Sequence, residues 1–246
     1  MSKIAIIGGT GLTSLSALSV SRREMVRTPY GEPSGPLTHG VFCKEDVVFL
    51  ARHGYGHTIP PHEVNYRANI WALKSIGIEH IISIAAVGGI RDDLVPGKLV
   101  IPDQLIDYTW SRNNTFFDRS ESGVTHIDFT WPYCEELRQS LIRASEVAKL
   151  DVSETGTYAA TQGPRLETAA EINRLERDGC DMVGMTGMPE AALAKELGLC
   201  YATCAVVANK AAGRNSGEIT MAEIEQNLAV GMEKVVRLTK AMLSTC

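Results

Sequence analysis

The chain has 246 residues, of which 24 are Lys or Arg and 29 are Asp or Glu, so its formal net charge is −5, and 44% of its residues are hydrophobic. This is the composition of a folded globular protein, and its mild acidity argues against nucleic-acid or membrane-surface binding, which depends on clustered Lys and Arg. An α/β domain of this length buries roughly three-quarters of the surface that its unfolded chain exposes. We therefore expect one domain over residues 1–246, in which a few local cations meet any anionic ligand.

The N-terminal apolar stretch is too short for a signal peptide, and no run approaches the length of a spanning helix, so we expect a cytoplasmic protein without a membrane partner. The six cysteines are scattered and form no C-x-x-C pair, which argues against a disulfide framework and against a zinc site. Cys200 and Cys204 lie in an apolar run, where a buried free thiol is the expected state.

Strand-like and helix-like runs alternate along the chain. Short apolar runs bounded by Gly, Pro or charge predict strands at Ile4–Ile7, Val47–Ala51, His80–Val87, Lys98–Ile101 and Tyr201–Ala208. Helices are predicted at Asn65–Ile76, from Thr168 to near Gly179, from Pro189 to Gly198, and from Thr220 onward. The alternation predicts an α/β domain with a largely parallel sheet, and residues 108–132 are expected to form an excursion of loop.

The first half of the chain offers three candidate sites for an anion. A strand runs into the turn Gly8-Gly9-Thr10-Gly11, which fits either a phosphate-type ligand or a simple tight turn. A dinucleotide-binding fold is the remote alternative, because Ser14 stands where its third glycine is needed. Arg52-His53 follows the second strand, where an Arg fork and a protonated His can hold an oxyanion. The turn after Ala86 carries two glycines, so a ring or a phosphate can lie against its backbone.

The second half offers three more candidates, each with a structural alternative. Glu167 precedes a capped helix, where it either favours the helix dipole or accepts a hydrogen bond from a ligand. Thr186 precedes Pro189 and fits both helix capping and anion binding. Asn209 ends an apolar strand, where it either forms a turn or reads a donor and an acceptor at once.

The order of these motifs is more specific than any one of them. The segments IIGGTGL, LARHG, HTI, VNYRANIWAL, QGPR and GMT…PE resemble the trimeric purine nucleoside phosphorylases, with the methylthioadenosine phosphorylases as the closest branch. The resemblance runs from Lys3 to about Leu243. It implies a single α/β phosphorylase domain around a mixed sheet, and phosphorolysis of a purine nucleoside with inorganic phosphate as co-substrate and no metal or organic cofactor.

The resemblance also implies a role for particular residues. Phosphate would be held by Thr10, Arg52, His53, the backbone near Ala86, and Thr186, while Met185 and Leu166 would meet the nucleoside. A homotrimer, either alone or paired with a second trimer, would bring His126 and either Phe116 or Phe117 into the neighbouring site.

Two departures from the methylthioadenosine branch bear on the substrate. Where that branch carries Asp-x-Asp, this chain has Asn209-Lys210-Ala211, which with Glu167 resembles the phosphorylases of 6-oxopurine nucleosides. In that pattern Asn209 bonds O6 and N7, and Glu167 accepts from N1–H.

The second departure concerns the 5′ side. All six His precede residue 127, so the His that 5′-hydroxyl-specific phosphorylases place near the last helix is missing. Met221 and Ile224 stand there instead, and they either form a pocket for a methylthio group or simply pack the helix. The combination predicts 5′-methylthioinosine as the preferred substrate. A methylthioadenosine phosphorylase and a general 6-oxopurine nucleoside phosphorylase are the alternatives.

Overall fold

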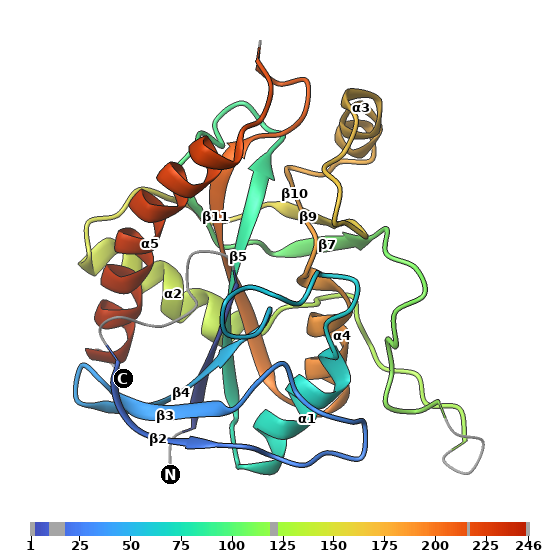
Figure 1. Ribbon diagram of the computed structural model, residues 1–246. Helices are drawn as coiled ribbons and strands as arrows, with labels where there is room; N and C mark the ends of the chain where they lie inside the picture. Colours follow the sequence, from blue (N-terminus) through green and yellow to red (C-terminus); the bar gives the residue numbers. More distant parts are fainter. Residues whose placement is uncertain (1–2, 10–17, 119–122, 216, 245–246) are drawn as a thin grey trace.

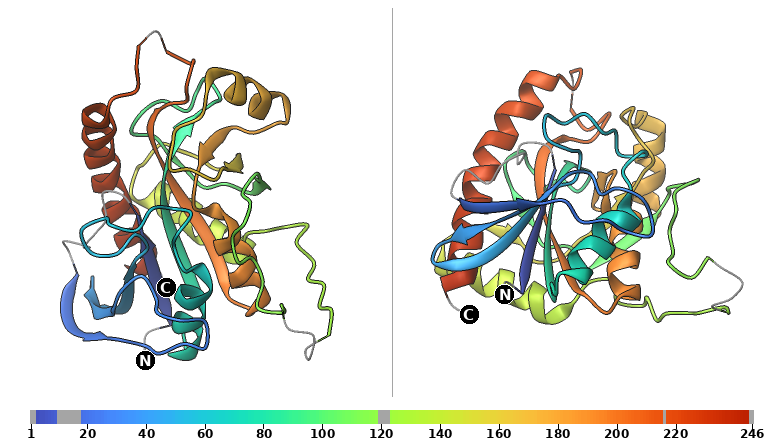
Figure 2. Two further views of the ribbon diagram at one scale, coloured as in Figure 1. Left: turned by 45° about the vertical axis from the view of Figure 1, so that its right-hand side comes forward. Right: turned by 60° about the horizontal axis from the view of Figure 1, so that its bottom comes forward.

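The computed structural model describes residues 3–9, 18–118, 123–215 and 217–244. Its strands form one mixed sheet with helices on both faces (Figures 1 and 2). The strands are β1 (Ile4–Gly8), β2 (Ser19–Glu24), β3 (Leu37–Phe42), β4 (Glu45–Ala51), β5 (His80–Gly89), β6 (Leu99–Val100), β7 (Gln104–Asp107), β8 (Val152–Ser153), β9 (Thr157–Ala160), β10 (Met182–Gly184) and β11 (Cys200–Lys210). The helices are α1 (Tyr66–Ser75), α2 (Glu135–Val147), α3 (Ala169–Arg177), α4 (Gly187–Glu196) and α5 (Met221–Ser244).

The sheet has a parallel centre and contains antiparallel pairs on both sides of it. β4, β1, β5 and β11 run parallel to their neighbours in this order. In contrast, β2, β3 and β4 form an antiparallel meander, and β10 lies antiparallel to β5. The expectation of a largely parallel sheet is confirmed for the centre and for β10, β9 and β7, which run parallel to one another. It was wrong for the β2–β3–β4 meander and for the pairing of β10 with β5, and the mixed sheet implied by the family resemblance is confirmed. The near-continuous apolar runs of β1 and β5 are explained by burial on both faces.

Two helical layers cover the sheet. One core cluster packs α2 and α5 against one face, and a second packs α1 and α4 against the other. Ile224, Leu228 and Val235 of α5 are buried as the apolar periodicity predicts, whereas Met221 at the start of the helix remains 61% exposed. None of the described helices is long and apolar enough to cross a bilayer.

The predicted helix starts are confirmed by their caps. Asn65 accepts from the amide of Ala68 at the start of α1, and Thr168 and Glu171 form the reciprocal capping box of α3. At α4 the helical geometry is interrupted at Met188, and the Thr186 side chain makes no capping hydrogen bond. The Thr186 side chain therefore does not cap α4.

The prediction that Cys200 is a free thiol was wrong. Cys134 and Cys200 form a disulfide across 66 residues of sequence, with 5.1 Å between their Cα atoms. The pairing arises because the chain entering α2 lies against β11, where the Cys134 amide donates to the Tyr201 carbonyl at 2.8 Å. Cys204, in contrast, is buried and unpaired as expected, and burial raises its thiol pKa to about 12.

Candidate active site

A cavity of about 410 Å³ opens where four parallel strands end. Gly9 follows β1, Arg52 follows β4, Gly88 lies near the end of β5, and Asn209 lies near the end of β11. Ligands of open α/β sheets gather at this edge, because the strand ends and the turns that follow them leave a crevice there. The mixed sheet thus brings candidate residues from distant parts of the chain to one cavity.

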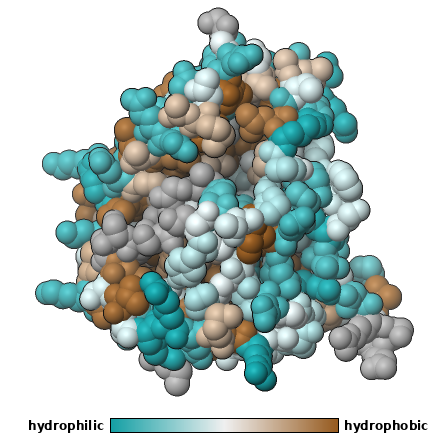
Figure 3. Space-filling view, in the orientation of Figure 1, coloured by the Kyte–Doolittle hydropathy of each residue, from teal (hydrophilic) through white to brown (hydrophobic). Residues whose placement is uncertain are grey.

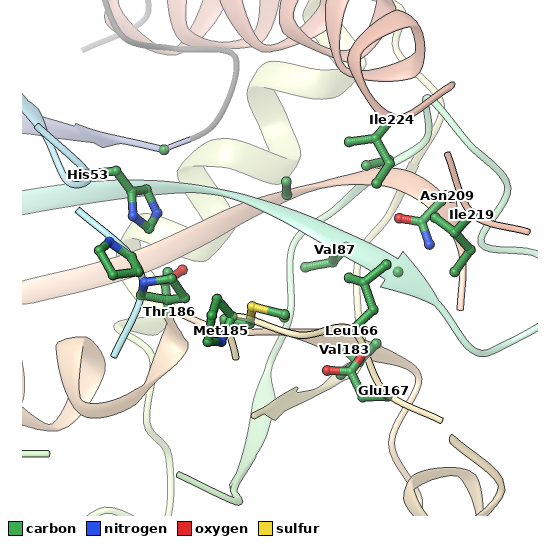
Figure 4. Close-up of a pocket in the computed structure, with 18 of the residues that line it drawn as sticks. His53, Val87, Leu166, Glu167, Val183, Met185, Thr186, Asn209, Ile219 and Ile224 are labelled. Carbon is green, nitrogen blue, oxygen red and sulfur yellow. The ribbon is translucent and has the colours of Figure 1, made fainter. Parts of the chain in front are cut away.

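Most of the predicted site residues line this one cavity. They are Arg52, His53, Ala86, Leu166, Glu167, Met185, Thr186, Asn209, Met221 and Ile224. Thr10 lies outside the described residues. Figure 4 shows His53 and Thr186 at one end, Asn209 and Glu167 at the other, and Met185 between them.

The polar end contains a buried ion pair that the sequence analysis did not anticipate. The Arg52 Nε and Nη2 atoms each donate to a carboxylate oxygen of Glu190 at 2.7 Å, and both side chains are buried. Burial opposes the guanidinium charge, but the Glu190 carboxylate more than compensates and raises the pKa of Arg52 above its ordinary value. Ser83 and Tyr201 also donate to Glu190, each at 2.8 Å. Glu190 therefore neutralises Arg52 and fixes its orientation.

His53 is a neutral group at this end of the cavity. Burial and then the charge of Arg52 lower the pKa of His53 to about 4. Its Nδ1 lies 2.8 Å from the Ile59 carbonyl, which can only accept, so Nδ1 carries the proton and Nε2 is the acceptor. The expectation of two cations facing an anion was wrong. His53 is uncharged at neutral pH, and the charge of Arg52 is paired.

The lowered His53 pKa predicts a pH dependence of stability. Between pH 6.5 and 4 the unfolded chain binds a proton at this His that the folded chain does not, so stability is lost as the pH falls through this window. The free energy of unfolding, measured by urea titration from pH 8 to 4.5, should fall more steeply below pH 6.5 in the wild type than in His53→Gln. Parallel curves for the two proteins would contradict the assignment.

At the other end, the side chains of Glu167 and Asn209 each keep part of their hydrogen-bonding capacity free. Thr161 Oγ1 donates to Glu167 Oε1 at 2.7 Å, while Oε2 accepts from no group in the described part of the chain. Asn209 Nδ2 donates one hydrogen to the Lys210 carbonyl at 2.7 Å, which leaves its second N–H and its Oδ1 for a ligand. This end can therefore bind a planar group that presents both donors and acceptors.

The wall between the two ends is apolar. It includes Ile59, the last residue of the HTI segment, and residues for which no role was predicted, namely Pro60, Pro61, Val87, Val183 and Ile219. Each lies within a few residues of a quoted motif, and this proximity was the only signal for them. Leu166 and Met221 carry the apolar surface outward at 43% and 61% exposure, and Figure 3 shows apolar side chains reaching the surface between α5 and α3.

The aromatic and imidazole groups assigned to a neighbouring site lie outside the cavity. His126 is exposed in the loop after residue 122 and does not line it. Phe116 is 9% exposed and packs edge-on against Tyr30, with 5.0 Å between ring centroids. Phe116 therefore packs in the core of its own chain.

Comparison with known proteins shows the family to which this chain belongs. A family model described as the phosphorylase superfamily matches residues 3–244. The chain belongs to the phosphorylase superfamily. It is an enzyme of the nucleoside phosphorylase type.

Relatives and solved structures agree with this placement of the phosphorylase. This chain is 55% identical over 244 residues to a probable S-methyl-5′-thioinosine phosphorylase from Pseudomonas syringae pv. tomato, and the match covers 99% of each chain. It is 49% identical to the 6-oxopurine nucleoside phosphorylase of Pyrococcus furiosus, covering 99% of this chain and 92% of that one. The methylthioadenosine phosphorylase of Schistosoma mansoni in complex with adenine superposes on this chain with a TM-score of 0.94 at 34% identity. The superposition covers 100% of this chain and 92% of the Schistosoma chain.

Proposed function

We propose that the phosphorylase cleaves 5′-methylthioinosine with inorganic phosphate to hypoxanthine and 5-methylthioribose 1-phosphate. The observation that carries this proposal is the pairing of a Glu167 carboxylate and an Asn209 amide at one end of a cavity whose wall is apolar. Relatives named S-methyl-5′-thioinosine phosphorylase and 6-oxopurine nucleoside phosphorylase support the same substrate class.

The base end matches a 6-oxopurine by hydrogen-bond complementarity. The free Glu167 Oε2 accepts from N1–H, which hypoxanthine has and adenine lacks. The remaining Asn209 N–H donates to O6, and Oδ1 accepts from N7 once that nitrogen is protonated as the purine leaves. An adenine in the same position would place its N1 lone pair against the carboxylate, and such a mismatch leaves buried polar groups unpaired.

The reaction is a displacement at the anomeric carbon. The bond from C1′ to N9 breaks with its electron pair going to the purine, and a phosphate oxygen forms the new bond to C1′. Asn209 stabilises the leaving purine by donating to O6, since negative charge develops on the purine in the transition state. Water supplies the proton that N7 takes up as the purine leaves, which gives neutral hypoxanthine. Phosphate bound beside C1′ is held in line for attack and stabilises the oxocarbenium character of the sugar.

The phosphate end fits a protonated phosphate. Nη1 of Arg52 donates to the Ile84 carbonyl at 3.0 Å and would lie 2.9 Å from a Cβ at Gly9, so it faces the residue that follows β1. The Thr186 hydroxyl and the Ala86 backbone supply neutral contacts at the same end. The neutral His53 Nε2 can accept from the one P–OH of hydrogen phosphate.

Product analysis tests this function. The purified protein should convert 5′-methylthioinosine to hypoxanthine and 5-methylthioribose 1-phosphate only when phosphate is present, as measured by chromatography of both products. Release of hypoxanthine without phosphate, or no release at all, would refute the proposal.

We further propose that the active unit is a homotrimer in which His126 of one subunit completes the site of the next. The exposed His126 loop and the exposed apolar rim formed by Leu166 and Met221 support this arrangement. Sedimentation equilibrium should give a trimer or a multiple of it, and a fully active monomer would contradict the proposal.

A further inference from the structure

Arg112 lies in the excursion between the sheet and α2, outside the cavity lining, and has an unusual set of partners. Its Nε donates to Gln162 Oε1 at 3.2 Å, and its Nη2 donates to the carbonyls of Gln162 at 2.8 Å and Thr161 at 3.3 Å. Its Nη1 donates to the carbonyls of Met185 at 2.8 Å and Met188 at 2.6 Å. One guanidinium thus binds two segments that are more than twenty residues apart in sequence.

Both of these segments carry site residues. The first is the turn that leads to Glu167, and Thr161 itself donates to the Glu167 carboxylate. The second holds Met185 and Thr186. Arg112 binds the carbonyl of Met185 itself and that of Met188, two residues after Thr186. Arg112 therefore lies behind the junction between the base end and the phosphate end of the cavity.

A third segment is joined to the same guanidinium. Nη1 also lies 3.3 Å from the Tyr66 hydroxyl, which donates to the carbonyl of Pro61 at 2.9 Å. Pro61 lines the apolar wall of the cavity. The base turn, the phosphate segment and the wall thus meet at one side chain.

Arg112 forms no ion pair with the described residues. No carboxylate lies within salt-bridge distance of Arg112 in the described residues, whereas nearby Arg165 pairs with Glu171 at 2.8 Å. A planar fork with five donors is suited to holding several carbonyls at fixed relative positions, which a lysine ammonium cannot reproduce. The close contact behind the junction agrees with this, since a Cβ on Gly163 would lie 2.4 Å from Met185 Sδ.

We propose that Arg112 is a positioning residue of the nucleoside site, which holds the turn that carries Glu167 and the segment that carries Thr186 at a fixed separation. The inference rests on the proposed function only in assuming that both ends engage one substrate. Displacement of reacting groups by about 1 Å can cost roughly 100-fold in rate, so loss of the guanidinium should act on kcat.

Chemical rescue distinguishes this role from a contribution to folding alone. Arg112→Ala should lower kcat about 100-fold for whichever purine nucleoside the wild type cleaves best, the scale expected for lost positioning. Millimolar guanidinium ion should restore about a tenfold part of the loss, because the free ion occupies the vacated site, and methylammonium at the same concentration should not. A folded Arg112→Ala enzyme with wild-type kcat, or one whose loss does not respond to guanidinium, would overturn the proposal.

Two further variants complete the test. Arg165→Ala removes an arginine of the same turn whose partners among the described residues are Glu171 and the Leu166 carbonyl. It should keep kcat within about twofold of the wild type without a guanidinium response. Equal loss in this control would show that any change to the turn matters and would overturn the assignment.

Arg112→Lys keeps the charge without the fork and covers the case in which Arg112→Ala does not fold. Its kcat should fall at least tenfold at an unchanged unfolding midpoint, and wild-type kcat in this variant would overturn the proposal. If the wild type cleaves no purine nucleoside, the function itself fails, and this is distinct from any of these outcomes.

Discussion

Asn209→Asp is expected to lower kcat/KM for 5′-methylthioinosine about 100-fold. The substitution removes the N–H that donates to O6 and places carboxylate oxygens against that acceptor, at a cost of about 2–3 kcal/mol. The Lys210 carbonyl, which now accepts from Asn209 Nδ2 at 2.7 Å, would also face a carboxylate oxygen. For 5′-methylthioadenosine, whose 6-amino group donates, the loss should be much smaller, so the ratio of the two kcat/KM values should shift towards adenine.

The matched control is Asn173→Asp, which makes the same chemical change on α3, where Asn173 accepts from Arg214 at 2.8 Å outside the cavity. It should leave the substrate ratio unchanged. An Asn209→Asp enzyme with the wild-type ratio would show that Asn209 does not read position 6 of the purine.

Glu190→Ala is expected to destabilise the folded protein by about 3–5 kcal/mol. The carboxylate is fully buried and accepts two hydrogen bonds from Arg52, one from Ser83 and one from Tyr201. Its removal leaves a buried guanidinium without its counter-ion, and such a charge is far costlier than the loss of the pair as a whole. The free energy of unfolding from urea titration at pH 7.5 measures the effect.

Two comparisons separate the lost ion pair from a general effect of truncation. Glu176→Ala breaks a pair with Arg214 in which the glutamate is 57% exposed, and it should cost at most about 1 kcal/mol. The double variant Arg52→Met with Glu190→Leu, which removes both charges, should be more stable than Glu190→Ala alone. If Glu190→Ala unfolds within 1 kcal/mol of the wild type, the buried pair does not have the role in stability assigned to it here.

The parts of the fold that were predictable are those with local signals. The capping box at Thr168, the Asn65 cap, and the apolar face of α5 each lie within a few residues of sequence, and the structure has them where the patterns indicate. The strand ends at Arg52 and Asn209 were marked for the same reason, because polar residues follow an apolar run. The sheet then brings them together.

What could not be predicted depends on long-range contacts. The partner of Arg52 is 138 residues away, and nothing local distinguishes Glu190 from a glutamate in the first turn of a solvated helix. Cys134 and Cys200 are likewise joined only by the packing of the α2 entry onto β11. Helix α2 has an amphipathic pattern that the prediction did not use, and β2 lies in exposed, polar sequence that lacks a strand signal.

In the proposed function Glu167 and Asn209 select a 6-oxopurine, and the apolar wall of the cavity receives the 5′-methylthio group. The most direct test is the ratio of kcat/KM for 5′-methylthioinosine to that for 5′-methylthioadenosine, with inosine as the third substrate, all at saturating phosphate. We expect this ratio to be at least about 100, the scale for leaving a buried polar group unpaired, and we expect inosine to be cleaved more slowly than 5′-methylthioinosine. Faster cleavage of 5′-methylthioadenosine than of 5′-methylthioinosine would contradict it.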